Sequence, residues 1–172
     1  DRDILGFLHD VADAAADTLD EIADWSLSGE REGQYSADVV IDDVIVDLLQ
    51  AAGFHVLSEE SGIADIEWPI TDDRLLAVVD PIDGSTNASR GVPWYATALC
   101  AIDKNGMRAG LVVNQSMQSD SYWATVGGGA FHNGTAMRPS SCADLAEAVV
   151  GVSGFPKQRP RWGQFRALGA AA

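Results

Sequence analysis

The chain has 172 residues, of which 47% are apolar, so it is long enough to form a compact domain with a buried core. Its formal net charge of −15 argues against nucleic acid as the main partner, because phosphate backbones are bound by Lys and Arg. No apolar run approaches the roughly 20 residues of a membrane span, and the acidic start does not resemble a signal peptide. Cys100 and Cys142 have no metal-ligand spacing, which is typical of buried thiols in a reducing cytoplasm.

The negative charge is concentrated in the first half of the chain. Residues 1–83 contain 22 acidic and 3 basic side chains, whereas residues 84–172 contain 4 acidic and 8 basic ones. Most acids of the first half fall on predicted helix faces, where a solvated surface explains them. The acids that follow predicted strands require a different explanation, and bound cations are the obvious one.

Two helices are predicted before the first strand. Residues 3–24 repeat apolar side chains at steps of three and four, which is typical of an amphipathic helix. Residues 26–36 are polar and contain glycine, so they predict a loop. A second helix is predicted over 39–52, with Gly53 in the position that follows a helix C-terminus. The apolar face of the first helix comprises Ile4, Leu8, Val11, Ala15, Leu19 and Ile22.

The rest of the chain is predicted to be mainly strands. Residues 54–57 form a short strand, and the apolar run 75–79 predicts a strand buried on both faces. Residues 95–102 and 107–114 flank an Asn-Gly pair and predict a hairpin. Further predictions are a strand at 122–126, glycine turns at 127–129 and 132–134, a short helix near 143–147 capped by Ser140 or Ser141, and a strand that starts at Ala148. This order of elements predicts an α+β fold.

Acidic side chains follow two of the predicted strands. Glu59 and Glu60 come after the first strand, and Asp80 and Asp83 come after the apolar run. Carboxylates that converge at strand ends repel one another unless cations lie between them, and hard oxygen ligands suit magnesium. The alternative is a capped turn beside a surface acid pair, but the two acidic runs about twenty residues apart favour a metal site.

The segments Ser58–Gly62 and Val78–Asn87 resemble the two signature motifs of the inositol monophosphatase family of lithium-sensitive, metal-dependent phosphatases. A looser likeness extends over nearly the whole chain, to residues 166–171. The resemblance implies a layered α/β/α/β/α sandwich. It divides the chain into an N-terminal metal- and phosphate-binding domain with an antiparallel sheet (1–145) and the truncated start of a second, α/β domain (146–172).

The resemblance also implies roles for individual residues. The metal ligands would be Glu59, Asp80, Asp83 and the main-chain carbonyl of Ile82. The catalytic residues would be Glu59, Asp83, Ser85 and an upstream aspartate of a Thr-x-x-Asp segment, which Asp42 resembles. Asp43 is an alternative for that role, and Asp42 could also be an ordinary solvated helix acid. The substrate phosphate would contact Ile82, Asp83, Gly84, Ser85 and Thr86.

The implied function is a Mg²⁺-dependent phosphomonoesterase that hydrolyses a small polyol or sugar phosphate by metal-activated water. Two or three magnesium ions, inhibition by Li⁺, a cytoplasmic location and a homodimer at full length are expected from the family. The chain lacks the family's C-terminal Trp-Asp-x-Ala-Ala-Gly motif, which contributes another metal ligand. An alternative is therefore a catalytically impaired, truncated homologue that acts as a metal- or protein-binding regulator. Trp94 and Tyr95 could line the substrate mouth, although packing is the commoner role.

Overall fold

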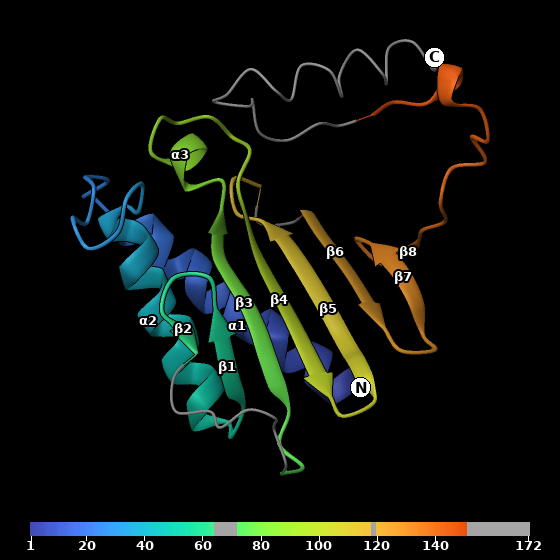
Figure 1. Ribbon diagram of the computed structural model, residues 1–172, viewed down its shortest axis with the longest axis horizontal. Coiled ribbons are helices and arrows are strands. Elements are labelled where there is room, and N and C mark those ends of the chain that lie inside the picture. The colour runs from blue at the N-terminus through green and yellow to red at the C-terminus, as the bar shows by residue number, and fades with distance from the viewer. Residues whose placement is uncertain (64–71, 118–119, 151–172) are drawn as a thin grey trace, which may run out of the picture. The chain divides into compact units, whose positions relative to one another are not determined.

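The computed structural model describes residues 1–63, 72–117 and 120–150, and its chain divides into two compact units, Asp1–Met137 and Arg138–Ala172. The described part of the first unit contains three helices and one eight-stranded sheet (Figure 1). The helices are α1 (Arg2–Glu21), α2 (Ser36–Ala51) and the single turn α3 (Ser85–Ala88). The strands are β1 (His55–Ser58), β2 (Gly62–Ile63), β3 (Leu76–Asp83), β4 (Ala96–Asp103), β5 (Gly106–Asn114), β6 (Asp120–Thr125), β7 (Gly129–His132) and β8 (Thr135–Ala136).

Both long helices form where the apolar period predicts them. The helix α2 begins three residues earlier than expected, because the Asp38 carboxylate accepts a hydrogen bond from the Tyr35 N–H at 2.9 Å and so stabilises the first turn. It ends at Ala51, and Gly53 follows with a φ of 85°, as its predicted place after the helix requires.

The sheet has the strand order β2-β1-β3-β4-β5-β6-β7-β8, so strands that follow each other in the chain mostly lie side by side. The pair β1–β3 is parallel and every other pair is antiparallel. The α+β prediction is confirmed, and so is the hairpin of β4 and β5. The strands β7 and β8 were not predicted, because each is short and lies between glycine-rich turns.

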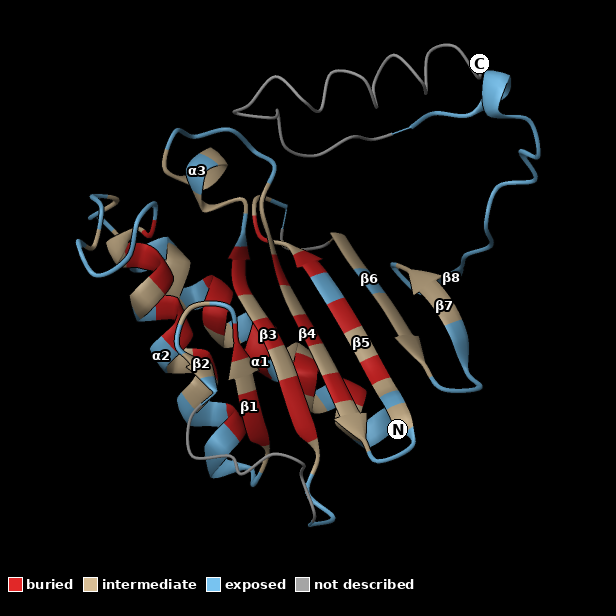
Figure 2. Cartoon of the chain, in the orientation of Figure 1, coloured by how far each residue is buried: buried red, intermediate tan, exposed pale blue. Residues whose placement is uncertain are grey.

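The core lies between the helices and one face of the sheet. The helix α1 contacts β4 and β5, and α2 contacts β1 and β3 (Figure 1). Buried and less buried residues alternate along β4 and β5 (Figure 2), as expected for a sheet with helices on one face. The run predicted to be buried on both faces follows the same rule, because Val79 is buried whereas Val78 is only half-buried. The helices α1 and α2 therefore cover one face of the sheet, and the side chains of the other face are not covered by these two helices.

Several smaller predictions need correction. Strand β3 does not end at Asp80 but continues through Pro81 to Asp83, with an irregularity in its pairing to β4 between the two aspartates. Of the two free cysteines, Cys100 is half-buried and Cys142 is exposed rather than buried.

The described part of the second unit has one short 3₁₀ helix, η1 (Leu145–Glu147). Its first turn is capped by Asp144, which accepts from the Ala146 N–H at 3.0 Å, and not by Ser140 or Ser141. Residues 148–150 are not in a strand, and the remainder of the strand predicted there lies outside the described residues. So do residues 166–171, and the domain boundary after residue 145 stays a prediction. No helix among the described residues is long and apolar enough to span a membrane.

Candidate active site

The parallel pairing of β1 and β3 brings the predicted acids to one edge of the sheet. Ser58 lies opposite Val79, and the Glu59 N–H donates to the Val79 carbonyl at 2.9 Å. Glu59 therefore lies beside Asp80, where two parallel strands end together. Burial raises the pKa of Asp80 to about 7, and the neighbouring charges of Glu59 and Asp83 act in the same direction. The carboxylates predicted from two separate motifs thus form one strongly interacting group.

An adjoining polar hollow of about 240 Å³ contains most of the other predicted site residues. It is called the acidic hollow here, and it is lined by Glu59, Glu60 and residues 82–87. Asp83 and Glu59 are exposed to solvent, whereas Ile82 is buried. The hollow therefore combines carboxylates with the backbone of the turn into α3. The residues predicted to contact phosphate, Ile82, Asp83, Gly84, Ser85 and Thr86, all line it.

The turn at Gly84 requires glycine for two independent reasons. Its φ of 91° lies in the left-handed region, and an added Cβ would lie 3.0 Å from the Trp94 carbonyl oxygen. The Asn87 side-chain amide donates to that same carbonyl at 2.8 Å and ties α3 to the chain that enters β4. The wall of the hollow is therefore fixed by close backbone packing.

A series of buried hydrogen bonds supports the segment Asp80–Asp83 from within the core. The Thr97 hydroxyl on β4 donates to the Pro81 carbonyl at 2.8 Å, and the Gln115 amide donates to the Thr97 oxygen at 2.9 Å. Thr97 is fully buried, and Gln115 is buried too. Neither residue could be predicted from the sequence, because their partners are 16 and 18 positions away and neither belongs to a motif.

Asp38, rather than Asp42, approaches the predicted catalytic hydroxyl. The Ser58 hydroxyl donates to the buried Asp42 carboxylate, so Asp42 supports the end of β1. Burial raises the pKa of Asp38, the nearby Glu60 raises it further, and the Ser85 hydroxyl lowers it. Oδ1 of Asp38 is buried, and no hydrogen-bond partner for this atom is found among the described residues. Asp38 lies three residues after Tyr35, as in a Thr-x-x-Asp segment, and is a further candidate for the upstream role, which stays a prediction for Asp42.

The loop between α1 and α2 forms hydrogen bonds with Glu60. The Arg31 guanidinium donates to the Glu60 carboxylate at 2.7 Å and to the Glu59 carbonyl at 2.8 Å. The Gln34 amide also donates to the Glu60 carboxylate. Glu60 is thus paired with a cation, whereas Glu59 is left to face Asp80. This contact could not be predicted from sequence, because the loop is polar throughout.

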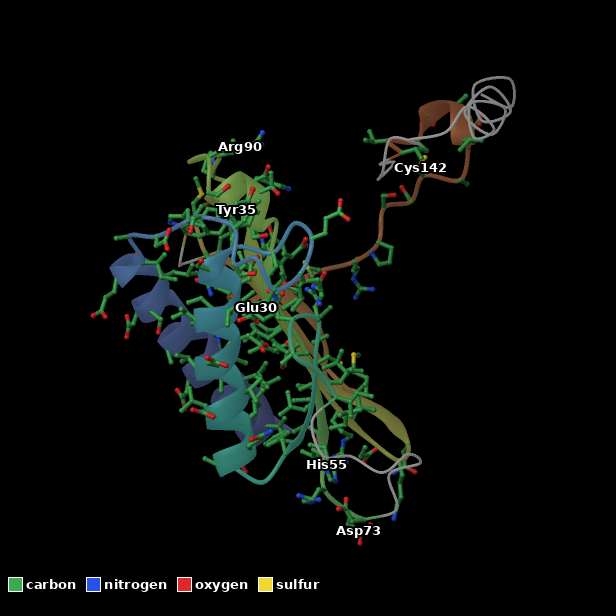
Figure 3. The ribbon with its side chains drawn as sticks, turned by 60° about the vertical axis from the view of Figure 1, so that its left-hand side comes forward. Glu30, Tyr35, His55, Asp73, Arg90 and Cys142 are labelled. Carbon is green, nitrogen blue, oxygen red and sulfur yellow. The ribbon has the colours of Figure 1, made fainter. Side chains whose placement is uncertain are left out.

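The same loop reaches the far wall of the acidic hollow. A hydrogen bond with Ser89 lowers the pKa of the Tyr35 hydroxyl, and a hydrogen bond with Thr86 lowers it further. Figure 3 shows Tyr35 and Arg90 at one end of this unit and His55 and Asp73 at the other, so the loop belongs to the end that carries the hollow. The loop therefore contacts both the acidic strand end and α3.

The donor atoms at this sheet edge suit a hard divalent cation. Carboxylate and carbonyl oxygens predominate, and the unpartnered Oδ1 of Asp38 together with the raised pKa of Asp80 indicate negative charge without a cation to balance it. Among the described residues, no group of three or more His, Cys, Asp or Glu side chains is arranged so that it could hold a metal ion. The oxygen donors at this edge are nevertheless of the type that Mg²⁺ prefers, and this ion usually keeps several water ligands.

A model of the inositol monophosphatase family matches residues 2–166. The chain therefore belongs to the inositol monophosphatase family. It is 32% identical over 133 residues to an inositol-1-monophosphatase of Mesorhizobium japonicum, a match that covers 76% of this chain and 48% of that protein. It is 31% identical over 133 residues to the Nus factor SuhB of Escherichia coli, with the same coverage of 76% and 48%.

Solved structures agree with this assignment. The extragenic suppressor protein suhB from Bartonella henselae superimposes with a TM-score of 0.78 at 26% identity, over 98% of this chain and 67% of that one. The chain spans about half the length of the curated relatives named above.

Proposed function

We propose that this protein hydrolyses the phosphate monoester of a small polyol or sugar, with Mg²⁺ as the required ion. The observation that carries the proposal is the acidic hollow, where carboxylates of two converging strand ends meet the backbone amides of a tight turn. Membership of the inositol monophosphatase family supports a phosphatase of this substrate class.

The metal would be held by Glu59, Asp80 and Asp83, together with the Ile82 carbonyl. When bound, Mg²⁺ would draw charge from the phosphate oxygens and make an adjacent water more acidic. The carboxylates balance this charge and orient the ion, while the amides of Gly84, Ser85 and Thr86 hold the phosphate. Two or three ions and inhibition by Li⁺ are expected from the family resemblance.

The chain's own residues would also orient the attacking water. The Ser85 hydroxyl, with Asp38 nearby, can accept a hydrogen bond from that water and pass its own proton toward the Asp38 carboxylate. Burial and the neighbouring acids raise the pKa of Asp38, which makes this carboxylate a better proton acceptor. Asp38 and Ser85 are therefore proposed as the water-orienting pair, in place of Asp42.

The cellular setting is a further part of the proposal. Two free cysteines are consistent with a reducing compartment, so a cytoplasmic location is proposed. The expected partners are one small phosphorylated substrate and a second copy of the full-length chain. Light scattering of the purified protein tests the homodimer directly.

A second candidate is a metal- or protein-binding regulator that has lost catalysis. The 31% identity to a protein named Nus factor SuhB favours considering it. Phosphate release separates the two candidates, since a regulator of this kind would release none.

The test is a phosphate-release assay of the whole protein on inositol, histidinol, fructose-bisphosphate and nucleotide phosphates, with and without Mg²⁺ and Li⁺. We expect Mg²⁺-dependent release that Asp83→Asn lowers on the order of a hundredfold or more. Asp73→Asn is the matched control, because Asp73 is an exposed carboxylate at the opposite end of this unit (Figure 3). Release from none of these esters, or full activity of Asp83→Asn, would contradict the proposal.

A further inference from the structure

The single-turn helix α3, which carries Ser85, is not held in place by burial in the core. None of its residues, Ser85–Ala88, is buried, and Ala88 packs only partly against the core. A helix of one turn has little stability of its own, because its first turn fixes several residues for few hydrogen bonds. The position of α3, and with it that of the Ser85 hydroxyl, therefore depends on polar contacts with the surrounding chain.

Two polar contacts connect α3 with other parts of the chain. The first is the hydrogen bond of 2.8 Å from the Asn87 amide to the Trp94 carbonyl. The second comes from the loop between α1 and α2, where the Tyr35 hydroxyl forms hydrogen bonds with Ser89 and Thr86. The Ser89 hydroxyl also donates to the Thr86 carbonyl at 3.0 Å, so these three side chains form one polar cluster at the end of α3.

The backbone of Tyr35 holds the Asp38 carboxylate. The Tyr35 N–H donates to Oδ2 of Asp38 at 2.9 Å, and the Tyr35 carbonyl accepts from the Asp38 N–H at 3.1 Å. Because Oδ2 is used in this way, the buried Oδ1 is the oxygen left for Ser85. The backbone of Tyr35 is itself held by an antiparallel bridge to Leu27. Tyr35 is therefore connected through its backbone to Asp38 and through its side chain to α3.

The shape of tyrosine suits this double connection. Its ring is rigid, and only two side-chain torsions separate the hydroxyl from the backbone. The Tyr35 ring is half-buried, which restricts these torsions further. A threonine in the same place, as in a Thr-x-x-Asp segment, would keep its hydroxyl beside its own backbone, whereas the phenol hydroxyl reaches α3. Figure 3 shows Tyr35 and Arg90, the residue after Ser89, at the same end of this unit.

We infer that Tyr35 positions the water-orienting pair, because it fixes Ser85 on α3 relative to Asp38 on α2. Tyr35 is a positioning residue and acts through these two side chains, since neither Tyr35 nor Ser89 lines the acidic hollow. The inference rests on the proposed phosphatase function, in which Asp38 and Ser85 orient the attacking water. Loss of the Tyr35 hydroxyl should therefore lower the rate of the chemical step more than it weakens substrate binding.

The kinetic experiment compares wild type, Tyr35→Phe and Ser89→Ala on the ester of the panel above that wild type hydrolyses fastest. Tyr35→Phe keeps the ring and the backbone contacts with Asp38 and removes only the hydroxyl. It should lower kcat about tenfold, the order expected when a reacting group is displaced by a fraction of an ångström. KM should rise by a smaller factor, because the turn at Gly84 stays fixed by its packing against the Trp94 carbonyl.

Two further variants make the result specific to the pair. Tyr122→Phe is the matched control, because it removes the same hydroxyl from a residue of β6 that does not line the acidic hollow. In a Ser85→Ala background, Tyr35→Phe should lower kcat no further, since the group through which Tyr35 acts is already absent. An equal fall of kcat in both backgrounds, or a rise of KM with unchanged kcat, would overturn the inference.

Amide hydrogen exchange tests the structural step without turnover. The N–H groups of Asn87 and Ala88 donate to the Gly84 carbonyl, and that of Ser89 donates to the Ser85 carbonyl, so their exchange reports the opening of α3. Exchange of these amides should be several-fold faster in Tyr35→Phe and Ser89→Ala than in wild type or Tyr122→Phe. Exchange at the wild-type rate in Tyr35→Phe would show that the hydroxyl does not hold α3.

The outcome is separable from that of the proposed function. If wild type hydrolyses an ester and Tyr35→Phe keeps the wild-type kcat, the inference fails and the phosphatase proposal stands. If wild type hydrolyses none of the esters, the phosphatase proposal fails. The exchange rates of α3 then decide by themselves whether Tyr35 fixes Ser85 relative to Asp38, since faster exchange in Tyr35→Phe supports this and equal exchange overturns it.

Discussion

The Thr97 hydroxyl donates a hydrogen bond of 2.8 Å to the Pro81 carbonyl inside the core, so a neutral side chain on β4 positions the acidic motif of β3. Thr97 is fully buried and itself accepts from the Gln115 amide. Pro81 lies between the two aspartates where the pairing of β3 with β4 is irregular, so this contact replaces the sheet hydrogen bonds that are interrupted there.

Replacing Thr97 with Val should therefore affect stability and catalysis together. Valine has nearly the same shape, but it removes the hydroxyl donor to the buried Pro81 carbonyl and leaves the Gln115 amide with only its longer hydrogen bond to the Ala12 carbonyl, at 3.3 Å. The free energy of unfolding should fall by about 1–3 kcal/mol, as expected for buried polar groups left unpaired. Urea denaturation measures the loss, and Thr135→Val, at an exposed position in β8, is the control. An unchanged midpoint in Thr97→Val would show that the contact does not support the motif.

Asp38→Asn and Asp42→Asn should have different effects, although the two residues lie one turn apart on α2. Asp38→Asn should lower kcat on the order of a hundredfold and leave stability nearly unchanged, because Asp38 is proposed to orient the water through Ser85. Asp42→Asn should instead lower the free energy of unfolding by about 1–2 kcal/mol, because it weakens the buried hydrogen bond from Ser58. Steady-state kinetics and urea denaturation of both variants check this, and the reverse pattern would restore the role first predicted for Asp42.

Asp80→Asn should stabilise the metal-free protein at alkaline pH. The folded-state pKa of Asp80 is raised to about 7 by burial and by Glu59, above its ordinary value of 3.8. The folded state therefore binds a proton more tightly than the unfolded state. This contribution to stability is fully present below pH 3.8 and is lost as the pH rises through about 7. The gain at pH 8 should be on the order of 1 kcal/mol, after allowing for screening of a half-buried group.

Thermal denaturation in the presence of a chelator, at several pH values, measures this effect. Added Mg²⁺ should raise the Tm of wild type at pH 8 and have a much smaller effect on Asp80→Asn. Equal Mg²⁺ responses in the two proteins would argue against Asp80 as a ligand.

Arg31→Gln should weaken the function of the site more than the stability of the fold. Arg31 is about half exposed, so its ion pair with Glu60 should contribute less than about 1 kcal/mol. Without the guanidinium, Glu60 is free to compete for the metal and the loop loses its contact with the strand end. The Mg²⁺ concentration for half-maximal activity should shift several-fold, whereas Arg74→Gln, which breaks an exposed ion pair with Asp72, should leave it unchanged.

Local sequence by itself determined the two long helices, most of the longer strands and the acids that line the acidic hollow. The apolar periods predict α1, α2 and the hairpin of β4 and β5, because those patterns reflect which side chains face the core. Glu59, Asp83 and residues 84–86 could be predicted to lie at strand ends, because each follows an apolar run within a few residues. The parallel pairing of β1 with β3, which local sequence does not specify, then brings these ends to one edge of the sheet. Contacts between residues that are close together in the chain can be predicted from the local sequence pattern.

Only the tertiary structure decided which helix acid approaches Ser85 and which residues support the motif. Asp38 and Asp42 lie four positions apart on one helix face, so periodicity cannot distinguish them. The packing of α2 against β1 pairs Asp42 with Ser58, and this leaves Asp38 for the site. The contact of Tyr35 with α3 depends in the same way on residues far apart in the chain, because the packing of the whole fold brings the loop between α1 and α2 to the strand ends.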